Sequence, residues 1–367
     1  MELLIRIVCI LVGLWFIVAV IRSCSKVALV NISAPDPLTS TVSRLLYSMM
    51  SAVILRQRTY RSRQKILAWF GPLFLFASIF CYFLFTMIGF ALIYRAVNAE
   101  PTFFQSLIAS GSALSTLGFH TPASQAGEVI SIIEGAVGLG VVVFLITFVP
   151  GYQAAVQERE ELSAKLYART GETPNCEAIY TWNAVANRRK SMEDFWDLWE
   201  DFLRSLGDIH AESPILIFTP SIRIGQSWIV SVFAVMDAAN LAATTIRNQG
   251  RPYAETCMHE GAKSLKRMAA TFQMLQDFEA RSPLTRSAFD HLCERLATSG
   301  YELEEDREKA WMGFACNRSQ YERILIFLAE SLFVALRTQL TQLDPPDSDK
   351  IVVSNIRLTE EERNETI

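Results

Sequence analysis

The sequence contains little that would support chemistry on a bound substrate. Only 20% of the 367 residues are charged, four are histidines, and the net charge at pH 7 is −4. We find no nucleophile paired with a base and no acid–base pair of the kind that enzymes use. Stretches of basic residues interleaved with aromatic residues, which nucleic-acid binding requires, are also lacking. We therefore expect neither an enzyme nor a nucleic-acid-binding protein.

A disulfide framework is also not expected. The seven cysteines are an odd number, and no C-x-x-C motif occurs. The pairs Cys257/His259 and His291/Cys293 together offer four ligands of the type that zinc prefers. Both pairs lie in predicted helices, where residues two positions apart face different directions. We therefore expect buried cysteines, no metal site and no cofactor.

Long apolar runs dominate the first part of the chain. Hydrophobic residues make up 51% of the sequence, with a mean hydropathy of +0.23. Three runs, Leu3–Ile21, Ile66–Tyr94 and Val129–Val149, are long enough to cross a hydrocarbon core of ~30 Å. The first could instead be a signal peptide, but no small-x-small cleavage site follows it. We predict a kink at Gly71-Pro72 in the second run and an end of the third at Pro150-Gly151.

Basic residues predict the orientation of these runs. Five of them immediately precede the second run: Arg56, Arg58, Arg61, Arg63 and Lys65. Positive residues beside membrane helices stay on the cytoplasmic side. The prediction is a multi-pass protein of the cell membrane with its N-terminus outside and its C-terminal domain in the cytoplasm. The stretch Leu45–Leu55 is too short to cross and is predicted to be an interfacial or packed helix.

A shorter segment lies between the second and third runs. Thr102–Leu114 is moderately apolar, follows Pro101, has Asn98 and Glu100 available near its cap, and gives way to the irregular stretch Ser115–Pro122. Half-helices followed by irregular backbone occur at membrane depth only where they line water or are buried in protein. The negative C-terminal end of such a helix favours a cation. The pattern is typical of a pore loop.

The residues after this segment resemble the filter of two-helix potassium channels, Thr-x-Gly-Tyr/Phe-Gly, at Thr116-Leu117-Gly118-Phe119. Ile132–Leu139 is similar to the Glu-Ala/Gly-x-x-Gly pattern that follows the filter in bacterial members. Three further motifs look like those of a bacterial potassium-channel-like family with a helical cytoplasmic domain: Gly171–Pro174, His210-x-x-Ser213-Pro214 and Gln226–Trp228. The resemblance covers most of the chain.

This resemblance implies an ion path. The Thr116 hydroxyl and the carbonyls of Thr116, Leu117, Gly118 and Phe119 would replace the hydration shell of a potassium ion. One loop per chain implies a homotetramer. His120 stands where the family has a second glycine, which would alter the outermost ion site. A weakly selective cation pore and a non-conducting, membrane-anchored sensor or assembly protein are the alternatives.

Several side chains near the filter have more than one interpretation. Glu134, an acid inside an apolar run, is predicted to support the filter, with gating-coupled titration or interfacial exposure as alternatives. Gly135, Gly138 and Gly140 could form a gating hinge or allow close helix packing. His120 could sense external pH, since imidazole titrates near neutrality, or its ring could cap the filter mouth.

The polar half predicts amphipathic helices. A helix start is predicted at Ser191, followed by core aromatic and aliphatic residues: Trp196, Trp199, Phe202, Leu203 and Leu206. Trp228–Ile246 is apolar, but it contains Asp237 and Asn240, so we predict a buried helix rather than a fourth membrane span. No Gly-rich nucleotide-binding fingerprint occurs. The expectation is a helical gating or assembly domain with an unknown cytoplasmic ligand.

The predicted fold is an all-α membrane protein in five parts. Residues 1–23 form an N-terminal membrane helix, and residues 24–64 a cytoplasmic linker with an interfacial helix. Residues 65–150 form the pore module of outer helix, pore helix, filter and inner helix. Residues 151–340 form the cytoplasmic domain. Residues 341–367, which contain Pro345-Pro346 and three aspartates, are predicted to be disordered rather than a calcium loop.

Overall fold

The computed structural model describes residues 2–29, 37–57, 60–122, 124–171, 173–185, 192–212, 216–217, 219–221, 223, 226–247, 250–271, 284–332, 334, 336–337 and 342–343. The expected helical fold is confirmed for these residues, with one small exception. Strands β1 (Leu336–Arg337) and β2 (Gln342–Leu343) pair antiparallel, so two residues of the predicted disordered tail, Gln342 and Leu343, belong to a strand. Ser191, Ser213, Pro214 and residues 344–367, on which further predictions fall, lie outside the described residues.

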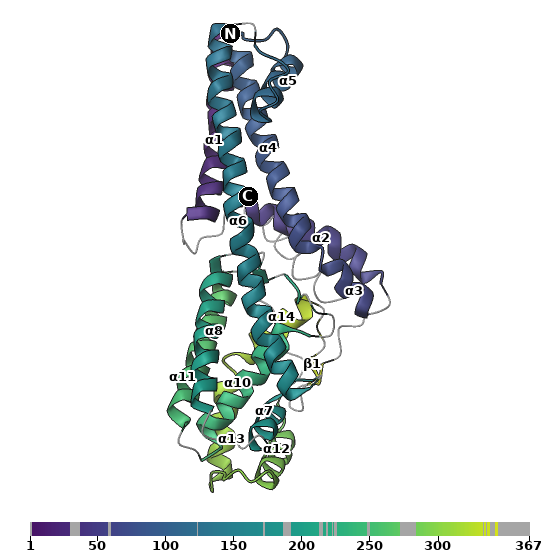
Figure 1. The fold of residues 1–367 in the computed structure, drawn as a ribbon, viewed down its shortest axis with the longest axis vertical. Helices are drawn as coiled ribbons and strands as arrows, with labels where there is room; N and C mark the ends of the chain where they lie inside the picture. Colours follow the sequence, from purple (N-terminus) through teal and green to yellow (C-terminus); the bar gives the residue numbers. More distant parts are fainter. Residues whose placement is uncertain are drawn as a thin grey trace, which may run out of the picture. The chain divides into compact units, whose positions relative to one another are not determined.

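The chain divides into two compact units (Figure 1). The first comprises Met1–Leu45 and Pro72–Ala154, and the second comprises Leu46–Gly71 and Ala155–Ile367. Four described helical segments are long and apolar enough to cross a membrane: Glu2–Ser25, Pro37–Leu55, Lys65–Ala96 and Gln125–Val143. The predicted membrane character is thereby supported by length and composition.

Three of these segments match the predicted apolar runs. They belong to α1 (Glu2–Leu29), α4 (Phe70–Ala96) and α6 (Gln125–Thr170). The fourth, α2 (Pro37–Leu55), has 19 residues, so the argument that this stretch is too short to cross was wrong. The error arose because the first turns of α2 contain polar Thr and Ser residues. The apolar run alone therefore begins several residues after the helix does.

Two predictions made at prolines were also wrong: the interruption of the second run comes at residues 68–69 instead of Gly71-Pro72, and the third run does not end at Pro150. α3 (Tyr60–Leu67) ends before α4 begins, and Pro72 lies in the first turn of α4 rather than at a kink. A proline is tolerated there because first-turn N–H groups have no partner within the helix. α6 continues through Pro150 and Gly151, because one missing hydrogen bond does not end a helix of 46 residues. It ends at Gly171, which has φ +87°.

In the first unit, α1 packs closely against α4. A Cβ on Gly13 would lie 2.5 Å from the carbonyl oxygen of Gly89, so the two backbones approach each other without intervening side chains. Further along the same pair, the Ser23 and Tyr82 hydroxyls are 2.9 Å apart. The order of these contacts shows that α1 and α4 run antiparallel.

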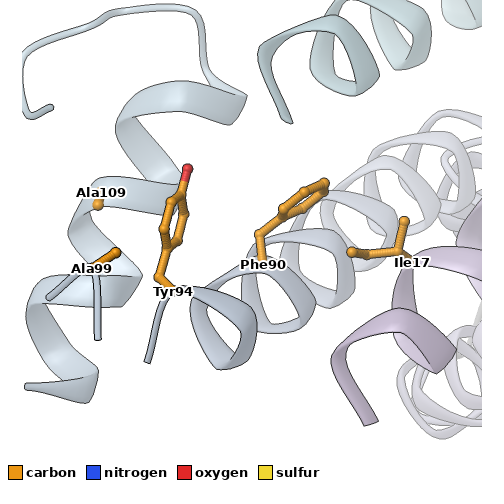
Figure 2. Close-up of a cluster of buried hydrophobic side chains, with 5 residues drawn as sticks. All are labelled: Ile17, Phe90, Tyr94, Ala99 and Ala109. Atoms are coloured by element: carbon orange, nitrogen blue, oxygen red, sulfur yellow. The ribbon is translucent and has the colours of Figure 1, made fainter. Parts of the chain in front are cut away.

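The core of this unit also includes α5 (Phe103–Leu114). Figure 2 shows its buried cluster, formed by Ile17 of α1, Phe90 and Tyr94 of α4, Ala99 of the following turn and Ala109 of α5. Partly buried residues of α6 pack against the same cluster. The short helix α5 therefore shares one apolar core with the three longer helices around it.

The second unit is built around α10 (Trp228–Thr244), all of whose residues except Thr244 are buried. The other described helices of this unit are α7 (Cys176–Val185), α8 (Met192–Glu212), α11 (Arg251–Thr271), α12 (Arg286–Thr298), α13 (Arg307–Arg318) and α14 (Glu322–Ser331). The predicted core residues of α8 are buried, and α11 packs against both α8 and α10.

The polar residues of α10 explain why an apolar helix belongs to this unit. The Arg318 guanidinium donates to both carboxylate oxygens of Asp237, at 2.9 and 3.2 Å, and the Tyr321 hydroxyl donates to the same carboxylate at 2.8 Å. Asn240 donates to the carbonyl of Phe314 at 2.9 Å. A buried charge requires such partners. The prediction of a buried helix is confirmed.

The cysteines of this unit behave as core residues. Cys176, Cys257 and Cys293 are buried, and burial is the main cause that raises the pKa of each thiol. A raised thiol pKa keeps the sulfur protonated and unreactive at neutral pH. Among the described residues, no group of three or more His, Cys, Asp or Glu side chains is arranged to hold a metal ion.

Candidate functional site

The short helix α5 begins at a well-defined cap. Thr102 has extended backbone angles (φ −128°, ψ 154°), and its hydroxyl accepts a hydrogen bond from the N–H of Gln105 at 3.2 Å. The predicted segment Thr102–Leu114 starts one residue before α5, because Thr102 is the cap, whose side chain satisfies a free N–H of the first turn. Glu100, expected near the cap, has a different partner that is described below.

α5 is held between the apolar helices α4 and α6 by hydrogen bonds. The Ser110 hydroxyl lies 2.9 Å from the Met87 carbonyl oxygen of α4 and is also hydrogen-bonded to the Glu134 carboxylate of α6. On the other side of that carboxylate, the Tyr94 hydroxyl of α4 donates to Oε2 at 2.9 Å. One acidic side chain therefore connects α4, α5 and α6.

Glu134 is completely buried within the chain, with 0% of its surface exposed. Interfacial exposure, one of the alternatives for this residue, is therefore wrong. Its hydrogen-bond partners here are Ser110 of α5 and Tyr94 of α4. The predicted filter-supporting role stays a prediction, and the geometry indicates that such support would act through α5.

Hydrogen bonds to the last turn of α5 orient the loop that follows it. The N–H of Gly118 donates to the Ser112 carbonyl at 3.2 Å, and the N–H of His120 donates to the Ser112 hydroxyl at 2.9 Å. The peptide bonds are trans, so each N–H points opposite to the carbonyl of the preceding residue. The carbonyls of Leu117 and Phe119 are thereby directed away from α5.

The loop contains two residues in the left-handed backbone region, Gly118 at φ +66° and Thr116 at φ +58°. This conformation costs a residue with a Cβ about 1–2 kcal/mol, and a β-branched residue rarely adopts it. A hydrogen bond from the Thr116 N–H to the Ala113 carbonyl, at 3.0 Å, helps to hold it. Strained backbone of this kind is typical of functional sites.

His120 does not need the conformational freedom of glycine. The non-glycine residues with positive φ in the described part of the chain are Asn98 and Thr116, so the backbone at His120 is not strained in this way. Its ring Nε2 lies 3.0 Å from Oε1 of Glu100. The ring therefore has a partner within the chain, and the two interpretations of His120, a sensor of external pH and a cap of the filter mouth, stay predictions.

The glycines of α6 differ in their surroundings. A Cβ on Gly138 would collide with the carbonyl oxygen of Leu114, whereas a Cβ on Gly135 would make an ordinary contact of 3.6 Å with Ala113. No atom lies within 4 Å of a Cβ on Gly140. Close packing against the end of α5 therefore accounts for Gly138, and it does not account for Gly140.

The loop and α6 present apolar surface that this single chain leaves uncovered. Leu117 is 72% exposed and Phe119 is 67% exposed. The large exposed apolar residues of α6 between its start and residue 143 are Val129, Ile132, Ile133, Leu139, Val142 and Val143. Surface of this kind requires lipid or further protein to cover it.

The structure brings together the sequence-predicted residues 116–120 and places Glu134 behind α5 rather than beside them. Sequence reasoning missed Tyr94, Ser110 and Ser112, and it did not pair Glu100 with His120. The spacing of Ser106 and Ser110, four residues apart in an otherwise apolar helix, was the available signal of a polar face. Comparisons of the chain with protein-family models, curated proteins and solved structures found no match.

Proposed function

We propose that this chain forms a cation channel that conducts potassium, with residues 116–120 as its filter. The observation that carries the proposal is the pair of hydrogen bonds to Ser112, which direct the Leu117 and Phe119 carbonyls away from α5. Backbone carbonyl oxygens can replace the water around a cation. The Thr116 hydroxyl and the carbonyls of Thr116 and Gly118 are the further ligands that the sequence resemblance implies.

The dimensions of α5 support the same proposal. Its 12 residues extend about 18 Å, which is less than the hydrocarbon core of ~30 Å that a spanning helix must cross. Because α4 and α6 flank it and are long enough to span, the C-terminal end of α5 falls within the depth of the membrane. That end carries the negative pole of the helix dipole, which favours a cation at the loop.

The proposed topology has three membrane spans, with the N-terminus outside and the second unit in the cytoplasm. α2 is long enough to cross, but its carboxyl half belongs to the second unit, where the Tyr47 hydroxyl donates to the Ser331 carbonyl at 2.9 Å. A helix engaged with a helical domain in this way is not free to cross the bilayer. A protease added on one side of the membrane tests this topology through a cleavable tag at the N-terminus. Removal of the tag only by protease on the cytoplasmic side would contradict an external N-terminus.

The proposed channel is a homotetramer, since a ring of carbonyls around one ion needs several copies of a single loop. We expect native mass measurement of the protein in lipid nanodiscs to give four chains. The side chains of Leu117 and Phe119 are exposed in the single chain, so we expect the other chains of the tetramer to cover them. Replacing both with serine should therefore weaken the tetramer or change its conduction. Replacing the exposed Met312 of the second unit with serine is the matched control. A stable monomer or dimer in lipid would contradict the proposal.

A further inference from the structure

A buried carboxylate lies beside the loop residue that departs from the family pattern. Glu100 comes just before the N-cap of α5, and only 6% of its side chain is exposed, whereas 35% of the His120 side chain is exposed. The ring Nε2 and the carboxylate oxygen are 3.0 Å apart. The donor and acceptor roles of these two atoms depend on the tautomer of the ring, and either assignment ties the ring to the acid. Burying this acid is favourable only while its partner stays in place.

His120 has a second attachment, at the other end of α5. Its backbone N–H donates to the hydroxyl of Ser112, which is fully buried in the last turn of that helix. The ring is thus tied to the start of α5 and the backbone to its end. We call Glu100, Ser112 and His120 the outer clamp.

We propose that Glu100 and Ser112 are positioning residues for ion selectivity, which hold the carbonyl of Phe119 in place through His120. This inference rests on the proposed channel function. The physical link is the peptide bond between Phe119 and His120. Because that peptide is planar and trans, fixing the direction of the His120 N–H also fixes the direction of the Phe119 carbonyl. The hydrogen bonds of the outer clamp therefore hold the Phe119–His120 peptide in one orientation, although His120 has no unusual backbone conformation of its own.

The clamp is independent of the support beneath the loop. The Gly118 N–H donates to the backbone carbonyl of Ser112, and no side-chain substitution at Ser112 removes that acceptor. Replacing Ser112 with alanine therefore frees the Phe119–His120 peptide and leaves the bond that orients Leu117 intact. This difference separates a role in positioning from a general role in folding.

One labelling pattern reports directly on the peptide in question. Of the four histidines, only His120 follows a phenylalanine, so protein with ¹³C-carbonyl phenylalanine and ¹⁵N-histidine gives a single Phe–His cross-peak in solid-state NMR spectra. The spectra are recorded on the full chain in lipid, in potassium and then in sodium. The variants for the spectra are Glu100→Gln and Ser112→Ala. The exchange of Glu100→His with His120→Glu has no Phe–His pair and is therefore measured by ion flux alone. Glu128→Gln, an exposed acid in the first turn of α6, is the control for lost negative charge.

We expect the Phe119 carbonyl signal in potassium to move in Glu100→Gln and in Ser112→Ala, and to stay in place in Glu128→Gln. The ratio of potassium to sodium flux in vesicles should fall about tenfold in the first two variants, as for the loss of one hydrogen bond. The exchange variant should recover most of the ratio.

The outcomes distinguish the two proposals. An unmoved carbonyl signal in Glu100→Gln and Ser112→Ala overturns the outer clamp whether or not the protein conducts. A moved signal with an unchanged flux ratio also overturns it, since the clamp would then have no part in selectivity. A wild-type carbonyl signal identical in potassium and sodium, together with no flux, contradicts the channel function instead. In that case a moved signal in both variants still supports the clamp as the restraint on this peptide.

Discussion

Replacing Gly118 with alanine is expected to lower potassium flux through the reconstituted protein by about tenfold or more. Gly118 has φ +66°, and no atom lies within 4 Å of the position that a Cβ would occupy. The added methyl group therefore meets no steric clash with neighbours. Its effect comes from the backbone, because the left-handed conformation costs an L-residue about 1–2 kcal/mol and the loop would relax away from it. Flux of potassium and of sodium into vesicles is the measurement.

The matched control for this variant is Gly151→Ala. Gly151 lies inside α6, does not have positive φ, and also has no atom within 4 Å of an added Cβ. Alanine in a helix is favoured over glycine by ~1 kcal/mol, so this variant should fold and conduct at least as well as the wild type. Equal flux in Gly118→Ala and Gly151→Ala would show that ions do not pass the loop.

The second large effect is expected from Gly138→Ala. A Cβ on Gly138 would overlap the carbonyl oxygen of Leu114 and lie 3.1 Å from its carbonyl carbon, both in the backbone at the end of α5. Backbone cannot rotate aside as a side chain can, so α5 or α6 must shift. Overpacking of this kind typically costs about 1–3 kcal/mol. We expect a lower unfolding temperature of the protein in lipid and a loss of flux, because α5 carries the loop.

Gly140→Ala separates close packing from a hinge. Gly140 lies in the same helix, and a Cβ there has no atom within 4 Å. If packing is the reason for glycine at position 138, Gly140→Ala retains its stability and its flux. If instead α6 must bend at Gly140 to open the pore, this variant loses flux without losing stability. That result would restore the gating-hinge interpretation, which the sequence alone left open.

The elements that the sequence predicted well have strong local signals. The apolar runs that became α1, α4 and the first part of α6 contain few charged residues, so their length alone distinguishes them. α5 was placed within one residue of its observed bounds, because a proline and a threonine mark its start and the apolar pattern stops at Leu114. Asp237 likewise distinguished a buried helix from a membrane span, because an acid can find hydrogen-bond partners inside a folded domain and lacks them in lipid.

The elements that were mispredicted depend on interactions that local patterns do not contain. Pro150 is typical of a helix end, yet α6 continues on both sides of it. The local sequence does not reveal that the helix tolerates the missing hydrogen bond. Ser112 is one of several serines in α5, and only the course of the loop around it makes it an acceptor for two N–H groups. The pairing of Glu100 with His120 joins residues twenty positions apart. No periodicity indicates such a contact.

The central claim is that potassium ions cross the membrane through the loop formed by residues 116–120. Its most direct test is potassium and sodium flux into vesicles that contain the purified full chain, beside protein-free vesicles and vesicles with Gly118→Ala. The account predicts a potassium flux that exceeds sodium flux by about tenfold or more, as for a binding difference of ~1.4 kcal/mol, and that is lost in the variant. Equal potassium and sodium flux, or no flux above protein-free vesicles, would contradict it.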